Sequence, residues 1–464
     1  MILPYVAHWS DNLFTPAKQC ELIESGVPLI ANIDLHPDKD VDYYQEKGYQ
    51  ELLQLCKALQ IPITLVSTQW EQCLLQRGEK LSPFIPDKQF KEPANKFIDT
   101  QEMKWLQSMY PNPNKVLFLL NNETPKIRWD QINNDADYIV RYPVGLSYEQ
   151  RKEILRDAWM SRFNIMFAQA RSLLTPEWSR VSRFIGYEAF ARPEVGRWHG
   201  WGTYSNDTHE MIDWQLGCFD GCSAVCYTHN WNTSRDHWIW SPQIECMNYL
   251  WQQRFMPPDY YFELSVWDGN YHWYPDMGYD EIWLSESKAC QYMKDGQTYT
   301  PERYEGFIQF CMWLMRCNIR EWRQWNVEPN RWALWTQKLI DVPSRVWRSS
   351  ILRKFWEEGV LIPNSKRAHP YNKNMPSEWL KQQRFYLLET SLMPATFTHL
   401  SENIPVFAIG WFSRGGDFLV YAHAPICEVE TTIEVPGYGE IKVAVPVKGG
   451  FWHIQGQSVQ KVDV

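Results

Sequence analysis

The stretch VLFLL, residues 116–120, is followed at once by Asn121, Asn122 and Glu123. Five consecutive apolar residues between polar segments are typical of a strand buried on both faces, as in parallel sheets. The polar triplet begins where this strand ends, and α/β folds gather their functional side chains at that edge of the sheet. The stretch therefore predicts a parallel sheet and a candidate site at its carboxyl edge.

Strand and helix patterns alternate around this stretch through roughly the first 320 residues. The other predicted strands are at residues 2–8, 28–35, 62–68, 183–190, 222–230, 260–268 and 306–315. The last of them is also long enough for a helix. Helical patterns cover residues 16–25, 43–59, 101–109, 148–174 and 242–255. Eight strands alternating with helices predict an α/β fold, a closed (β/α)8 TIM barrel.

The sequence after residue 340 has a different pattern. A basic, Trp-rich helical stretch at residues 345–356 is followed by a polar loop, and from residue 385 short alternating runs such as PVFAIGWFS and FLVYAHAP are separated by Gly and Pro. These runs predict a small C-terminal antiparallel β-sandwich domain. We place the catalytic barrel at residues 1–340, a helical linker region packing on it at 341–380, and the β-sandwich at 381–464.

Composition excludes several classes of protein. The net charge of -9, without an uninterrupted basic run, argues against nucleic acid as a partner. No stretch reaches the roughly 18 apolar residues of a membrane span. Eleven cysteines without a CxxC pair favour reduced thiols. Cys218, Cys222 and Cys226 recur every four residues, but a strand would scatter them, so we predict no metal and no cofactor.

Two observations bear on location. The first residues, MILPYVAHWS, lack a basic segment followed by a long apolar one, which predicts a cytoplasmic protein, or a periplasmic one if a leader was trimmed. Asn122 to Thr124 matches the glycosylation pattern N-x-S/T, and a glycan there would occupy the candidate site. A bacterial origin, where this pattern usually goes unread, fits better.

The 26 tryptophans are consistent with two interpretations. Trp has a flat apolar face and a polar N–H group, which suits stacking on the C–H face of a sugar ring. A large barrel also buries many aromatic side chains for packing alone. The aromatic content therefore indicates a carbohydrate as one substrate class without establishing it.

Two glutamates are the principal catalytic candidates. Glu123 follows the fourth predicted strand and Glu263 lies on the seventh, and these strands face each other across a barrel of eight. Retaining hydrolysis of a glycosidic bond requires two carboxyl groups about 5 Å apart, one as acid/base and one as nucleophile. Glu188, on the fifth strand, is a competing acid, for which we favour a structural or substrate-binding role.

The pair Asn122-Glu123 at the end of strand four, together with Glu263 on strand seven, resembles glycoside hydrolase clan A, the retaining (β/α)8 β-glycosidases. The resemblance implies that Asn122 binds the sugar 2-hydroxyl, that Glu123 is the acid/base and that Glu263 is the nucleophile. It also implies a Tyr or His beside the nucleophile, for which His229 and Tyr227 are the candidates.

The stretches NNETPKIRW, YTHNWN and WSPQIECMN resemble the marine-galactan families 42 and 167, which contain β-galactosidases and β-carrageenases. This resemblance implies a β-linked red-algal galactan or its oligosaccharides, such as carrageenan, as substrate. The zinc-binding cysteine cluster of many family 42 enzymes has no clear counterpart here. A β-galactosidase and an agarase- or porphyranase-like hydrolase are alternatives, and so is a non-catalytic carbohydrate-binding barrel, although such a barrel has no reason to keep both glutamates.

Further residues close to predicted strand ends are candidates for substrate binding. Tryptophans there could dry the pocket and stack a sugar, and polar residues could bind hydroxyl or sulfate groups; the candidates are Trp70, Trp231, Trp267, Asp34 and Arg128. Each also has a structural interpretation, since Arg128 can pair with a nearby aspartate and a Trp can cap the barrel. The expected partner is an oligosaccharide or polysaccharide, and homo-oligomerisation is left open.

Overall fold

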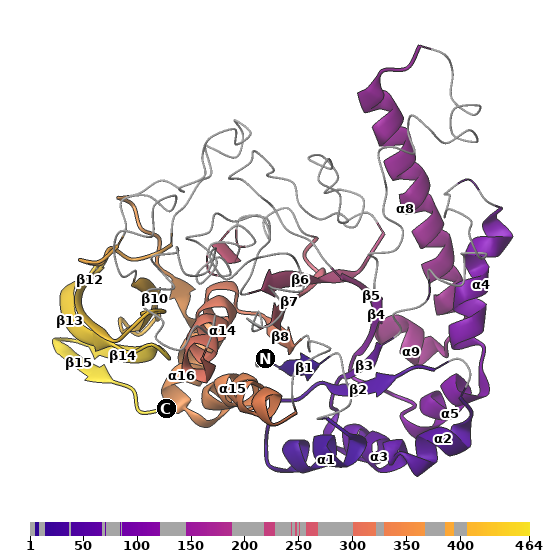
Figure 1. The fold of residues 1–464 in the computed structure, drawn as a ribbon, viewed down its shortest axis with the longest axis horizontal. Coiled ribbons are helices and arrows are strands. Elements are labelled where there is room, and N and C mark those ends of the chain that lie inside the picture. The colour runs from indigo at the N-terminus through magenta and orange to yellow at the C-terminus, as the bar shows by residue number, and fades with distance from the viewer. Residues whose placement is uncertain are drawn as a thin grey trace, which may run out of the picture.

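The computed structural model describes residues 5–8, 14–36, 39–66, 70, 84, 86–120, 145–187, 218–227, 243, 246–247, 250, 257–267, 300–321, 329–366, 386–393 and 406–464. Two units are visible in Figure 1, namely a ring of strands surrounded by helices and a group of antiparallel strands near the C-terminus. Helices α14 (Pro301–Met315), α15 (Pro329–Arg348) and α16 (Ser350–Glu358) lie between them.

The first unit is an eight-stranded parallel sheet that closes on itself. Its strands are β1 (Val6–His8), β2 (Ala31–Asp34), β3 (Ile63–Val66), β4 (Val116–Leu120), β5 (Ser182–Tyr187), β6 (Gly221–Tyr227), β7 (Tyr261–Trp267) and β8 (Asn318–Glu321). Neighbours in sequence are neighbours in the sheet, β1 pairs with β8, and a bridge between Val6 and Leu29 joins β1 to β2. The sheet is therefore a closed barrel, as predicted.

The tilt of the strands follows from their registers. Residue 34 of β2 pairs with Val66 of β3. Following the pairing from each strand to the next gives Leu119, Ile185, Gly221 and Tyr261. Extended through β8 and β1, the pairings return to β2 at residue 26, so one circuit displaces the register by eight residues, from 34 to 26. A shear of eight is the value of the (β/α)8 barrel.

The outer helices follow the strands in the order that the sequence predicts, with three differences. They are α1 (Pro16–Glu24), α2 (Val41–Glu46), α3 (Tyr49–Leu59), α4 (Asp87–Ile98), α5 (Gln101–Met109), α8 (Tyr148–Leu173) and α9 (Pro176–Val181). The single helix predicted at 43–59 is divided into α2 and α3 because Gly48 has a φ of 87°, outside the helical region. Helices α4 and α9 lie where the sequence predicts no helix, and α4 tolerates Pro93 while burying Phe90 and Phe97.

The predicted eighth strand at 306–315 is wrong. These residues belong to α14, and the barrel is closed instead by β8, whose sequence is NIRE. Residues 303–315 of α14 are all buried, because the helix packs between the barrel and the C-terminal strands. A helix buried all round has no polar stripe, so its sequence resembles that of a buried strand.

The second unit contains two antiparallel sheets. One has the order β15-β14-β11-β10-β9, and the other pairs β12 (Val429–Val435) with β13 (Gly439–Val445). The strands of the first are β9 (Val360–Leu361), β10 (Phe407–Phe412), β11 (Phe418–His423), β14 (Gly450–Gln455) and β15 (Ser458–Lys461). A separate apolar cluster lies between these sheets. The predicted C-terminal β-sandwich is therefore confirmed, whereas the predicted boundary at 340 falls within α15.

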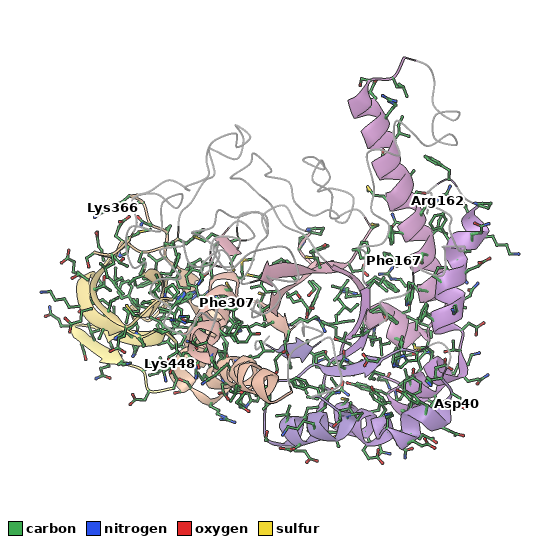
Figure 2. All side chains as sticks on the ribbon, in the orientation of Figure 1. Asp40, Arg162, Phe167, Phe307, Lys366 and Lys448 are labelled. Carbon is green, nitrogen blue, oxygen red and sulfur yellow. The ribbon has the colours of Figure 1, made fainter. Side chains whose placement is uncertain are left out.

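Alternation along the strands gives the barrel two unlike faces. The outward side chains, such as Phe118 and Leu264, join a large apolar cluster with the helices, which includes Phe167 of α8 and Phe307 of α14 (Figure 2). The inward face carries a small apolar cluster that includes Leu117, and beside it a set of buried polar side chains. The polar part of the inner face is where the candidate site begins.

Candidate functional site

Polar side chains occupy two successive levels of the barrel interior. Because the strands tilt, residues at the same height along the barrel axis are offset from the register pairs by one position per strand. At each height, or level, the inward-facing side chains therefore come from four alternate strands. The lower of these levels contains Ala7, Thr64, Ile185 and Glu263, and the next contains Asn32, Leu119, Ser223 and Arg320. Their apolar members come from β1, β4 and β5, so the polar groups gather on the β6–β8 side and on β2 and β3.

Glu263 is held by hydrogen bonds from two neighbours. The Nε of Arg320 donates to Oε1 of Glu263, and Nη2 donates to Oε2 at 3.3 Å. Oε2 also accepts the hydroxyl hydrogen of Tyr261 at 2.8 Å. Both side chains of the ion pair are fully buried. The arginine therefore supplies a positive counter-charge and fixes the plane of the carboxylate.

The contacts continue across the barrel. Nη2 of Arg320 reaches Thr64 Oγ1 on β3 at 3.1 Å, which joins opposite walls. Asn318 donates to the hydroxyl of Tyr261 at 2.9 Å and accepts the backbone N–H of Tyr5 at 3.0 Å. The polar interior is therefore one connected network from β1 through β8 and β7 to β3, and it contributes to barrel closure.

Charged and aromatic groups lie beneath Glu263. The ammonium of Lys115 is 5.1 Å from the ring centre of Tyr261. Burial and the nearby Arg183 lower the pKa of Lys115, whereas burial and the charge of Glu263 raise the pKa of Tyr261 well above its usual value. Tyr261 thus remains a neutral hydrogen-bond donor to Glu263 across the physiological pH range.

Glu263 lies deep in the barrel, well below the carboxyl end of its strand. It is the third residue of β7, which continues to Trp267. Four residues of tilted strand correspond to roughly 11 Å along the barrel axis. On the opposite wall Glu263 is level with Phe118 of β4, and the strand continues to Leu120 before Asn121, Asn122 and Glu123 follow in sequence. Glu263 therefore lies on β7, as predicted from the sequence, but well below the carboxyl end of that strand.

Three polar atoms just above Glu263 have no hydrogen-bond partner within the described part of the chain: Asn32 Oδ1, Ser223 Oγ and Ser265 Oγ. Asn32 uses its Nδ2 to donate to Asp34 at 3.1 Å, so only its oxygen lacks a partner. Buried polar atoms normally have partners, and exceptions point to water or a ligand. The sequence predicted none of these three residues, nor Thr64 or Arg320, although polar residues at inward positions of buried strands are visible as a pattern.

The other predicted site residues are divided between described and undescribed parts of the chain. Tyr227 and Trp267 are the last residues of β6 and β7 and are register partners, so their backbones lie together at the carboxyl edge. Asp34 ends β2 at the same edge. The remaining candidates lie outside the described residues: Asn122, Glu123, Arg128, Glu188, His229 and Trp231.

The predicted role of Trp70 as a wall of the sugar pocket is not supported. Its side chain is fully buried and stacks on Phe97 of α4, with ring centres 5.5 Å apart and an interplanar angle of 11°. It also contacts Phe118 and Phe184, which point outward from β4 and β5. Trp70 therefore packs in the shell between barrel and helices, where apolar burial favours a large aromatic side chain.

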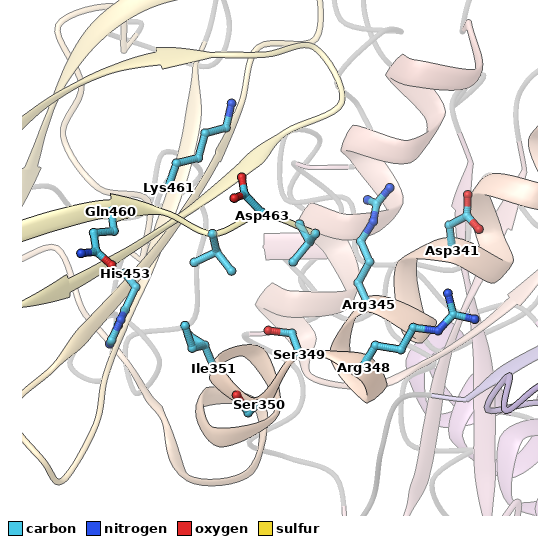
Figure 3. Close-up of a pocket in the computed structure, with 12 residues that line it drawn as sticks. Asp341, Arg345, Arg348, Ser349, Ser350, Ile351, His453, Gln460, Lys461 and Asp463 are labelled. Carbon is cyan, nitrogen blue, oxygen red and sulfur yellow. The ribbon is translucent and has the colours of Figure 1, made fainter.

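A polar cavity of about 540 Å³ lies elsewhere in the protein. Its walls come from the end of α15, the start of α16, β14 and β15 (Figure 3). Arg348, Lys461, Asp341 and Asp463 are among the residues that line it, so charges of both signs are present. The cavity is remote from the strand ends where barrels of this type carry out chemistry.

Two further findings concern the described residues alone. They contain no group of three or more His, Cys, Asp or Glu side chains arranged to hold a metal ion. No helix among them is long and apolar enough to cross a membrane.

Comparisons with known proteins give only distant likenesses. No family model and no curated protein matches the chain. The crystal structure of SrfJ from Salmonella typhimurium is 9% identical with a TM-score of 0.42, covering 98% of this chain and 90% of that one. The homocysteine methyltransferase MmuM from Escherichia coli is 8% identical with a TM-score of 0.23, covering 73% and 95%. Likenesses at this level assign neither a family nor an activity.

Proposed function

We propose that this protein is a retaining glycoside hydrolase that cleaves β-glycosidic bonds, with Glu263 as nucleophile and Glu123 as acid/base. One observation carries the proposal: a buried carboxylate, Glu263, faces the barrel axis from β7 with its own arginine and tyrosine. In sequence, the opposite strand, β4, is followed by Asn121, Asn122 and Glu123. Carboxyl groups on facing strands are the minimum that this mechanism requires.

The two residues would divide the reaction as follows. Glu123 gives its proton to the glycosidic oxygen while the Glu263 carboxylate forms a bond to the anomeric carbon and the leaving alcohol departs. Glu123, now ionised, then takes a proton from water, whose oxygen displaces Glu263 from the anomeric carbon. Arg320 and Tyr261 would hold the carboxylate in place and disperse its charge when it is released.

The depth of Glu263 constrains where the substrate binds. The carboxyl groups of Glu123 and Glu263 must lie about 5 Å apart, on either side of the cleaved bond. Because Glu263 lies well below the end of β7, the sugar that it attacks must enter the barrel below the strand ends. A site that receives one terminal sugar from above fits this requirement better than an open groove.

The substrate class is proposed from the sequence resemblance to the marine-galactan families. A β-linked red-algal galactan or its oligosaccharides, such as carrageenan, is the first choice. Aryl β-galactosides and desulfated, partly sulfated and unsulfated galactans, assayed for released sugar and product length, would distinguish this choice from a β-galactosidase or an agarase- or porphyranase-like enzyme.

The catalytic assignment is tested with Glu263→Ala and Glu123→Gln. We expect Glu263→Ala to abolish hydrolysis, and sodium azide to restore turnover by attacking the vacated face and giving a glycosyl azide of inverted configuration. Glu123→Gln should lose roughly 10²- to 10⁴-fold in kcat. A 2-deoxy-2-fluoro glycoside should label Glu263 covalently, as peptide mass spectrometry would show.

Glu305 offers a matched control, because its buried carboxylate in α14 is ion-paired with Lys338 at 2.9 Å and with Arg345 at 2.5 Å, outside the barrel. Glu305→Gln should leave kcat unchanged wherever the variant is folded. If labelling and azide rescue both fail for Glu263 in a folded enzyme that hydrolyses sugars, its assignment as nucleophile is wrong.

A second candidate is a carbohydrate-binding barrel without catalysis. The complete burial of Glu263 and its pairing with Arg320 favour this candidate, since a buried ion pair can have a purely structural role in joining strands. On this hypothesis the wild-type protein binds an oligosaccharide in calorimetry but releases no sugar from any β-linked substrate, and Glu263→Gln changes stability alone.

A further inference from the structure

The polar atoms above Glu263 that have no partner in the described part of the chain belong to three strands but to nearly one level. Asn32 Oδ1 on β2 and Ser223 Oγ on β6 share the level of Arg320, and Ser265 Oγ on β7 is one residue step higher. The three side chains are 1%, 0% and 0% exposed. An unpaired buried hydroxyl or amide oxygen destabilises the folded state, so three of them within one residue step imply that something polar satisfies them during function.

The wall formed by β3, β4 and β5 at this height is apolar. Val66 of β3 lies across the barrel from Ser265, Leu119 of β4 lies across from Arg320, and Ile185 of β5 lies just below. A pyranose ring has the same division, because its hydroxyl groups project from the edge while its C–H groups form an apolar face. Small side chains at Ser223 and Ser265 also leave more room on β6 and β7 than the branched residues that usually fill such layers.

We propose that Asn32, Ser223 and Ser265 form a hydroxyl-binding subsite for the sugar ring that reacts with Glu263. The inference rests on the proposed function: if the Glu263 carboxylate bonds to an anomeric carbon, the ring attached to that carbon must lie directly above it, at the level of these three atoms. The two serine hydroxyls donate to and accept from ring hydroxyls, and the Asn32 oxygen accepts from one. Their pattern selects among epimeric sugars.

The subsite is tested with Ser223→Ala and Ser265→Ala, assayed on 4-nitrophenyl β-glycosides of galactose, glucose, mannose and xylose. On the best of these substrates each variant should lose roughly 3- to 10-fold in kcat/KM, the value of one neutral hydrogen bond. Each should also melt at a higher temperature than the wild type without ligand, because an unsatisfied buried hydroxyl has been removed.

Deoxygenated substrates separate binding from packing. We assay the 3-, 4- and 6-deoxy forms of the best substrate. The loss of kcat/KM caused by a serine variant should disappear for the one deoxy form that lacks the sugar hydroxyl bound by that serine. A purely structural serine would give the same penalty on all forms. Thr390→Val is a matched control, since Thr390 Oγ1 is also buried without a partner in the described chain but lies in the C-terminal unit. It should raise the melting temperature and leave kcat/KM unchanged.

The outcomes distinguish the two proposals. If Glu263 is labelled by the fluoro sugar but both serine variants keep kcat/KM within twofold of the wild type, the subsite is wrong and the glycosidase stands. If Glu263 is not labelled and no β-linked sugar is hydrolysed, the glycosidase and the subsite are both rejected.

Discussion

Replacing Arg320 by Met, alone and together with Glu263→Gln, shows whether Glu263 is needed for stability, for hydrolysis or for both. The substitution removes a cation that is fully buried and makes two contacts with Glu263 and one with Thr64. Among the described residues, the hydroxyl of Tyr261 would then be the one remaining hydrogen-bond partner of the carboxylate in the barrel interior. Breaking a buried pair on one side costs about 3–5 kcal/mol, and complete burial places this pair toward the upper end.

The double variant Glu263→Gln, Arg320→Met removes both charges. Replacing a buried pair by neutral side chains of similar volume is often close to neutral in stability, so we expect the double variant to recover most of the about 3–5 kcal/mol that Arg320→Met loses. It should nevertheless hydrolyse nothing, because the nucleophile is absent. Recovery of stability without recovery of turnover is the signature of a chemical role.

The assay is thermal unfolding followed by near-ultraviolet circular dichroism, with kcat/KM measured on the same preparations. Transitions of the barrel and of the C-terminal sheets must be resolved, since a protein of two units need not unfold in one step. The reasoning is refuted if Arg320→Met is as stable as the wild type to within about 0.5 kcal/mol, or if the double variant loses the sum of the single losses.

Three further predictions concern the described residues. Trp70→Ala should lose about 3–5 kcal/mol of stability with KM unchanged in the folded fraction, and a raised KM at an unchanged melting temperature would contradict its place in the shell. Burial lowers the pKa of His423 to about 3, against about 6.5 unfolded, so its contribution to stability is complete above pH 6.5 and is lost as the pH falls toward 3. Between pH 7 and 5 this loss is about 2 kcal/mol, and His423→Phe should flatten that part of the stability profile; an equally steep profile would contradict it. The hydrogen bond from Lys354 lowers the pKa of Asp417, so Asp417→Asn should destabilise the C-terminal sheets by about 1 kcal/mol at neutral pH. This difference in stability should vanish as acid protonates the carboxyl group of the wild type. Calorimetric scans that show a constant difference down to pH 2 would count against it.

Most of the barrel can be predicted from the sequence because most of its strands are apolar runs of the kind that buried parallel strands have. Val116–Leu120 is predicted residue for residue, and β5, β6 and β7 are predicted to within three residues at either end. The eighth strand fails for a physical reason: NIRE points Asn318 and Arg320 into the barrel, where they bond to Tyr261 and Glu263, so the strand has no apolar run. The adjacent α14 has such a run because it is buried on every side.

The site is less predictable because the depth of a side chain depends on strand register. The residue types indicate that Glu263 lies on β7, but its level relative to β4 is set by the eight-residue shear, which involves pairings of all eight strands. Trp70 shows the same limit, since a tryptophan just after a strand can face either the mouth or the helices, and only the neighbouring Phe97 of α4 decides between them.

The polar interior also bears on why the shell of this barrel is so aromatic. A barrel core is ordinarily filled by branched apolar side chains, whereas the described interior of this one contains a buried ion pair and three polar atoms without a partner among the described residues. Such groups contribute little to stability or reduce it, so the apolar burial that holds the barrel together must come from outside the ring of strands. The stacked rings of Trp70, Phe97, Phe118 and Phe184 lie there. If this division is correct, substitutions to Ala in the shell should destabilise the barrel by several kcal/mol, whereas Ser265→Ala in the interior should stabilise it.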